Sequence, residues 1–152
     1  INKLIKKNIS ISVAESCTGG LIANSITKFS GVSKIFSYGI ISYSNTSKIK
    51  YLGVSKKNLL EFGAVSQQVA QEMINGLYKN EKTQLCISTT GIAGPKGGTK
   101  EKPVGLVFIG VKIGRKVVVN KSNFENKGRT YIQKQSVKKS LNLLLKLIRQ
   151  DS

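Results

Sequence analysis

Apolar and polar residues alternate over residues 9–14, and this period of two predicts a half-buried strand. Over residues 19–29 the apolar positions instead recur at the three- to four-residue spacing of an amphipathic helix. Residues 35–43 are rich in β-branched and aromatic side chains, which favour a second strand. The first third of the chain therefore predicts a strand, a helix and another strand.

The middle of the chain predicts helices followed by a buried strand. Two short helical segments are expected at residues 46–52 and 56–62. Ser66 is a suitable N-cap for a longer helix that runs to about residue 79 and carries one apolar stripe. Residues 83–90 are largely apolar, so we expect a strand at the centre of the sheet.

The last third predicts a hairpin and a closing helix. Residues 104–112 and 116–124 are expected to pair around a two-residue turn at Gly114 and Arg115. A helix with a broad apolar stripe begins near Arg129. The whole order predicts one α/β domain over residues 1–152: a three-layer-like sandwich with a mixed sheet, an antiparallel hairpin and helices on both faces.

Composition narrows the class of protein. Cys17 and Cys86 form neither a CxxC pair nor a zinc-site spacing, so we expect reduced thiols in a cytoplasmic protein. No apolar run approaches the length of a membrane span, and no leader pattern is visible. The chain has no histidine, which excludes Ser-His-Asp and Cys-His mechanisms within it and disfavours a catalytic transition-metal site. A serine hydrolase built on this chain needs Lys, Tyr or a carboxylate as its base.

The net charge of +18 raises the question of nucleic-acid binding. Only three of the 25 basic residues are arginine, and the lysines are spread along the whole chain. That distribution favours a solvated basic surface over a nucleic-acid interface. The positive field would also attract a small anionic substrate.

The turn "AESCTGG" is the first candidate for ligand binding. Gly19 and Gly20 would open a helix whose free N–H groups suit an anion or a carbonyl oxygen, and Ser16 and Thr18 add hydroxyls at a strand end. The alternative is a tight corner that only packs the sheet. Cys17 lacks a histidine partner, so we interpret it as a packing residue.

Two further segments carry candidate chemistry. In "YSNTSK", a desolvated Lys48 could take a proton from a serine hydroxyl with Tyr43 as a relay, although a solvated surface lysine is the commoner case. The loop "TTGIAGPKGG" follows an apolar strand and could present a concave array of backbone donors with Thr89 and Thr90 at its base. Its alternative is a mobile surface loop.

These segments together resemble a known family. "AESCTGG", "GVSKIF", "YSNTSK", "GAVS" and "TTGIAGPKGGTKEKPVG" are similar in order and spacing to the C-terminal domain of the CinA family of competence-damage-inducible proteins. The resemblance covers most of the chain and implies a nicotinamide mononucleotide deamidase. Such an enzyme hydrolyses the carboxamide group of nicotinamide mononucleotide, and the products are nicotinate mononucleotide and ammonia. The reaction is a step of pyridine nucleotide salvage. The resemblance further implies a Ser/Lys mechanism with no metal or cofactor, and a homodimer.

The resemblance also implies roles for individual residues. It assigns Ser33 as the nucleophile, Lys48 as the base and Tyr43 as the assisting hydroxyl. Substrate binding falls on Ser16, Thr18, Gly19, Gly20, Thr90, Gly94, Gly97, Gly98 and Arg129.

One departure from the family pattern concerns the segment before the last helix. The family usually has FxGDR there, whereas this chain has "FENKGR", which places Arg129 one residue later. This departure leaves open a domain that binds a pyridine nucleotide without turnover. A second alternative, a competence- or DNA-associated role, is suggested by the family's name and by the net charge of +18.

Overall fold

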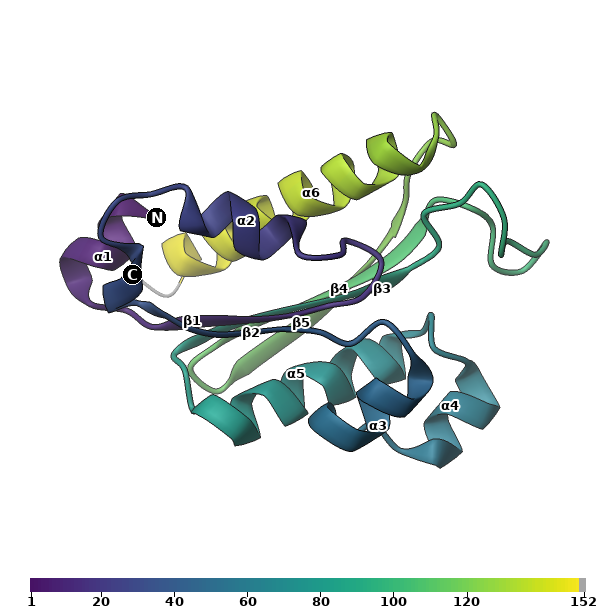
Figure 1. Cartoon of the computed structure of the whole chain (residues 1–152), viewed down its shortest axis with the longest axis horizontal. Coiled ribbons are helices and arrows are strands. Elements are labelled where there is room, and N and C mark those ends of the chain that lie inside the picture. The colour runs from purple at the N-terminus through teal and green to yellow at the C-terminus, as the bar shows by residue number, and fades with distance from the viewer. Residues whose placement is uncertain (151–152) are drawn as a thin grey trace.

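The computed structural model describes residues 1–150 and shows a five-stranded sheet between two layers of helices (Figure 1). The strands are β1 (Ile11–Glu15), β2 (Phe36–Ile41), β3 (Leu85–Gly91), β4 (Leu106–Ile113) and β5 (Lys116–Asn123). The helices are α1 (Asn2–Lys7), α2 (Leu21–Thr27), α3 (Asn45–Leu52), α4 (Lys56–Phe62), α5 (Gln67–Glu81) and α6 (Arg129–Gln150), with a short 3₁₀ turn, η1 (Val32–Lys34), before β2. The predicted α/β sandwich is confirmed.

The sheet is mixed, in the order β2-β1-β3-β4-β5. The first three strands in this order are parallel, whereas β3, β4 and β5 pair antiparallel. The predicted hairpin is present, because β4 and β5 are joined by the two residues Gly114 and Arg115. The prediction that the third strand is central is also confirmed. In this topology, the carboxyl ends of β1, β2 and β3 share one edge of the sheet.

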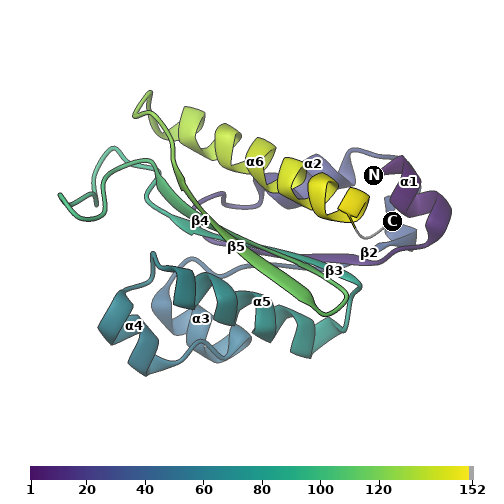
Figure 2. The same ribbon diagram turned by 180° about the vertical axis from the view of Figure 1, so that it is seen from behind.

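Helices cover both faces of the sheet. Figures 1 and 2 show α1, α2 and α6 on one face and α3, α4 and α5 on the other. Strand β1 is therefore buried on both sides, where the sequence predicted a half-buried strand. The polar member of its alternation, Ser12, is fully buried and satisfied by the Thr83 hydroxyl at 2.6 Å.

Close packing of α5 sets the position of α3. A Cβ at Gly76 of α5 would lie 1.8 Å from the backbone oxygen of Leu52, the last residue of α3, so only glycine permits this approach. Helix α3 starts at Ser44, whose hydroxyl accepts the Ser47 N–H at 3.1 Å. The first turn of α3 carries Lys48 and is thereby fixed over the carboxyl ends of the parallel strands.

The sequence prediction omitted α1 and η1. Helix α1 is only six residues long and carries a single fully buried side chain, Leu4, so its periodic signal is weak. None of the helices within residues 1–150 combines the length and the apolar character that a bilayer crossing requires.

Candidate active site

A cavity of about 260 Å³ lies at the carboxyl ends of the parallel strands. This edge is where open α/β sheets usually bind ligands. The predicted residues that line it are Ser16, Tyr43, Lys48, Thr90, Gly94, Gly97 and Arg129. The structure therefore brings together one residue after β1, two after β2, several around the end of β3 and the first residue of α6.

Lys48 is almost completely buried, at 1 % exposure. Its Nζ donates to the backbone oxygen of Ser42 at 2.7 Å and lies 3.4 Å from that of Tyr43. The third contact of Nζ is the Ser16 hydroxyl, at 3.0 Å. The two backbone oxygens can only accept hydrogen bonds, so each binds one N–H group of the Lys48 amine. The third substituent position of Nζ, which carries either a proton or the lone pair, therefore points to the Ser16 hydroxyl.

Burial changes the protonation of this lysine. It lowers the pKa of Lys48 from 10.5 to about 8, against a smaller opposing effect of Cys17. Within the described residues, no carboxylate forms an ion pair with Nζ that would restore the usual pKa. Near pH 8 a substantial fraction of the amine is neutral, and its lone pair can accept the Ser16 hydroxyl proton across the 3.0 Å contact.

Ser16 is held in place by its backbone. Its N–H donates to the Thr89 backbone oxygen at 3.1 Å, and its own backbone oxygen accepts the Gly19 N–H at 3.1 Å. Gln133 of α6 adds a third restraint, because its Nε2 donates to the Cys17 backbone oxygen at 3.0 Å. The turn is thus tied to β3 on one side and to α6 on the other.

The prediction that Gly19 and Gly20 present free helix N–H groups to a ligand is wrong. The buried carboxylate of Glu15 occupies the start of α2, accepting N–H bonds from Gly20 at 3.1 Å, Ile22 at 3.1 Å and Ala23 at 2.8 Å. Both glycines adopt positive φ values, 57° and 97°, and their role here is to form the turn.

Other predicted binding residues also have structural roles. Thr18 is fully buried and bonds the Thr89 hydroxyl at 2.8 Å, away from the cavity lining. Thr90 lines the cavity, but its hydroxyl donates to the Ala64 backbone oxygen at 2.7 Å. Gly98 does not line it either, and a Cβ there would lie 2.8 Å from the Val104 nitrogen.

The structure does not bring Ser33 to Lys48. Ser33 is exposed in η1, which precedes β2, whereas Tyr43 and Lys48 follow β2. A strand of this length separates the two ends by roughly 20 Å. The assignment of Ser33 as the nucleophile is therefore corrected, because its hydroxyl cannot exchange a proton with Lys48. The serine whose hydroxyl contacts the Lys48 Nζ is Ser16.

Arg129 reaches the cavity despite its shifted place in the sequence. Its Nη1 donates to the Gly94 backbone oxygen at 2.8 Å and its Nη2 to the Tyr43 hydroxyl at 2.5 Å. The guanidinium thus links the glycine loop after β3 to the segment after β2. The predicted proton relay through the Tyr43 hydroxyl is not what the structure shows, since Tyr43 contacts Lys48 through its backbone oxygen.

Cys17 lines the same cavity but has the character of a packing residue. Burial raises the pKa of its thiol to about 12, so the thiolate is scarce at neutral pH.

Within residues 1–150 no three His, Cys, Asp or Glu side chains lie close enough together to bind a metal ion. The sequence prediction gave no individual role to six further lining residues, namely Ala64, Val65, Gly91, Ile92, Ala93 and Lys96. The apolar residues among them carry no sequence pattern that indicates a site. They belong to the segments between α4 and α5 and after β3, which come together only in the fold.

Comparisons with known proteins identify the family of the chain. The family described as CinA C-terminal domain matches residues 1–148. A CinA-like protein of Kosmotoga olearia is 54% identical over 121 residues, which cover 80% of this chain and 29% of that protein. The chain spans about a third of the length of the curated relatives it matches.

Solved structures share the fold. The crystal structure of a competence/damage inducible protein from Agrobacterium tumefaciens is 38% identical and has a TM-score of 0.92, covering 96% of this chain and 89% of that one. A competence-damaged protein (CinA) superfamily protein from Escherichia coli is 29% identical with a TM-score of 0.90, covering 96% and 84%.

Proposed function

The chain belongs to the CinA C-terminal domain family, and on that premise we propose that it hydrolyses the carboxamide of nicotinamide mononucleotide to nicotinate mononucleotide and ammonia. The observation that carries the proposal is the 3.0 Å contact between the buried Nζ of Lys48 and the hydroxyl of Ser16. A lysine with a lowered pKa beside a restrained serine is a nucleophile-and-base pair that needs no histidine.

The first step forms an ester on Ser16. Neutral Lys48 takes the hydroxyl proton, and Oγ attacks the carboxamide carbon to give a tetrahedral oxyanion. The N–H of Cys17 follows the nucleophile directly and, within residues 1–150, donates to no other residue, so it is available to stabilise this oxyanion. The Lys48 ammonium then returns the proton to the leaving nitrogen, the C–N bond breaks and ammonia departs.

Water completes the cycle. Lys48, neutral again, removes a proton from a water molecule as that water attacks the ester carbon. The ester bond breaks, Ser16 regains its proton from the Lys48 ammonium, and the nicotinate product leaves. The two backbone oxygens that hold Nζ keep its orientation constant through both halves of the reaction.

We assign the substrate phosphate to the side of the cavity that is formed by the glycine loop after β3 and by Arg129. Arg129 uses two of its N–H groups on protein oxygens, which leaves the others for an anion. Lys96 lies in the same lining, and within residues 1–150 the N–H groups of Gly94, Lys96 and Gly97 donate to no other protein atom. This concave set of donors suits a phosphate group.

Ammonia release tests the proposal. The substrate is nicotinamide mononucleotide, and the matched controls are nicotinamide riboside, which lacks only the phosphate, and nicotinamide. We expect efficient release from the mononucleotide alone, unchanged by a chelator. Binding of the mononucleotide without ammonia release would instead support a non-catalytic nucleotide-binding domain, and retention on DNA without release would support a competence-associated role. We also propose that the protein is cytoplasmic and forms a homodimer, as the sequence analysis predicted.

A further inference from the structure

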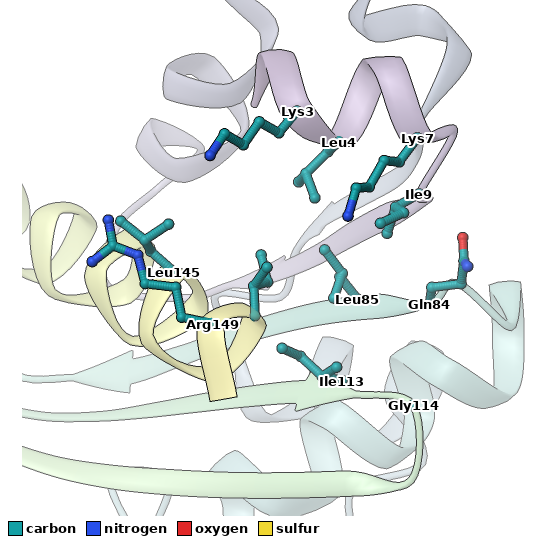
Figure 3. A pocket seen from close by; sticks show the side chains of 11 residues that line it. Lys3, Leu4, Lys7, Ile9, Gln84, Leu85, Ile113, Gly114, Leu145 and Arg149 are labelled. Carbon is teal, nitrogen blue, oxygen red and sulfur yellow. The ribbon is translucent and has the colours of Figure 1, made fainter. Parts of the chain in front are cut away.

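A second and larger cavity, about 940 Å³, lies at the opposite edge of the sheet (Figure 3). It is bounded by α1, by the segments where β1 and β3 begin, by the end of β4 and by the last turns of α6. The candidate active site lies beyond the other ends of the same parallel strands. Within the described part of the chain the two cavities share no lining residue, so an inference about this one does not rest on the proposed function.

The walls of the cavity are apolar. They are formed by Leu4, Ile9, Leu85, Ile113, Leu145 and Ile148. Leu4 and Leu85 are buried, whereas Leu145 is 45% exposed. Leu145 therefore contributes exposed apolar surface to this cavity.

The rim of the cavity is cationic. Figure 3 shows Lys3 and Lys7 extending from α1 toward α6, whereas Arg149 extends from the last turns of α6. Among residues 1–150 no acidic residue lines the cavity, and the ion pair that the structure shows, Lys127 with Glu125, lies elsewhere. Gln84 adds a neutral donor, because its Oε1 accepts the Ser10 N–H at 2.9 Å while its Nε2 is left available.

We propose that this cavity binds a small amphipathic anion, with an apolar body against the sheet and one carboxylate or similar head group at the cationic rim. The volume lies within the range of about 300–1,000 Å³ that is typical of small-molecule sites. The apolar walls desolvate the body of such a ligand, and three cations that form no ion pair with an acidic residue among residues 1–150 attract its head. Among residues 1–150 no aromatic side chain lines the cavity, which disfavours a nucleobase as occupant.

Calorimetric titration with decanoate, below the concentration at which it forms micelles, tests the proposal. We expect saturable binding at one site, and no comparable binding of 1-decanol, which lacks the charge. The double variant Lys3→Glu/Lys7→Glu should raise Kd at least tenfold. The control Lys134→Glu/Lys138→Glu changes two exposed lysines of α6 outside the cavity and lowers the net charge equally, so it should change Kd less than twofold.

A neutral variant separates the apolar wall from the charge. Leu145→Gln should weaken decanoate binding several-fold, and because Leu145 is partly exposed, the thermal melting curve should stay close to that of the parent. Absence of saturable decanoate binding to the parent protein would overturn the proposal. Equal weakening by the two lysine double variants would also overturn it, because the binding would then follow net charge rather than this cavity.

Discussion

Serines lie at both ends of the parallel strands, yet only one end has the environment of a reactive hydroxyl. Ser16 follows β1, is 8% exposed and lies 3.0 Å from the Lys48 Nζ. Ser33 precedes β2 at the opposite end, is exposed and, in the described part of the chain, makes no side-chain hydrogen bond. The comparison shows that the neighbours of a hydroxyl, and not the residue type or a local motif, determine its chemistry.

The difference between the two ends originates in the environment of one lysine. The chain has 25 basic residues, but Lys48 is the one in the described part whose pKa burial lowers to about 8. The segments after β1 and β2 enclose the Lys48 Nζ. This burial lowers the pKa of Lys48 and also brings the Ser16 hydroxyl into contact with the amine. The predictions below test whether this lysine accounts for the contrast.

Removal of Lys48 should have the largest effect. Lys48→Met keeps the length and apolar stem of the side chain but removes the base, so we expect ammonia release to fall about 10³-fold or more. The control is Lys50→Met on the same helix, whose side chain is exposed and lies over the Tyr51 ring. It should retain nearly full activity. A Lys48→Met protein with parent-like turnover would exclude Lys48 as the base.

The pH dependence should follow the lowered pKa of Lys48. Because the neutral amine is the active form, kcat/KM should rise with pH and level off above about pH 8. Between about pH 8 and 10.5, Lys48 is protonated in the unfolded chain but neutral in the native protein. Because the unfolded state binds more protons in this window, the free energy of unfolding should rise with pH, by roughly 1–3 kcal/mol. Denaturant unfolding of the parent and Lys48→Met at several pH values measures this rise. An identical pH dependence in both proteins would contradict the assigned pKa.

Loss of Arg129 should have an intermediate effect. Arg129→Ala removes a charged donor from the loop side of the cavity, so KM for the mononucleotide should rise about 10- to 100-fold with a smaller change in kcat. Arg149→Ala, at the other end of α6, is the control and should leave both constants unchanged. Steady-state kinetics distinguish the two, and an effect mainly on kcat would place Arg129 nearer to the reacting amide.

The smallest expected effect concerns the support of the Ser16 turn. Gln133→Ala removes one hydrogen bond to the Cys17 backbone oxygen, which is worth about 1 kcal/mol, so we expect a roughly fivefold fall in kcat with KM unchanged. Gln135→Ala on the same helix leaves that bond intact and should have no effect. If the two variants behaved alike, α6 would not position the turn.

Local sequence patterns predicted most of the fold because the elements are locally encoded. The cap at Ser66, the hairpin at Gly114 and the buried strand β3 all follow from patterns within a few residues. Helix α1 was missed because six residues carry too little periodicity. The elements that hold the candidate site could therefore be placed, though not always with the right burial.

The site itself was only partly predictable. The resemblance identified Lys48 and Arg129, which the fold brings to one cavity, but it misplaced the nucleophile at Ser33. Proximity to Lys48 depends on β1 and β2 being parallel neighbours, a non-local property that no short motif contains. The rule that ligands bind at the carboxyl ends of parallel strands would have favoured Ser16, because it follows β1 directly. Likewise, the capture of the α2 N–H groups by Glu15 became visible only in three dimensions.

The most direct test of the central claim is a paired measurement of ammonia release from nicotinamide mononucleotide by Ser16→Ala and Ser33→Ala, at pH 8 and with both variants shown to be folded by their thermal melting curves. Ser16→Ala should lose nearly all activity, whereas Ser33→Ala should match the parent protein, because only Ser16 lies within reach of Lys48. Parent-like turnover by Ser16→Ala together with an inactive Ser33→Ala would contradict the account.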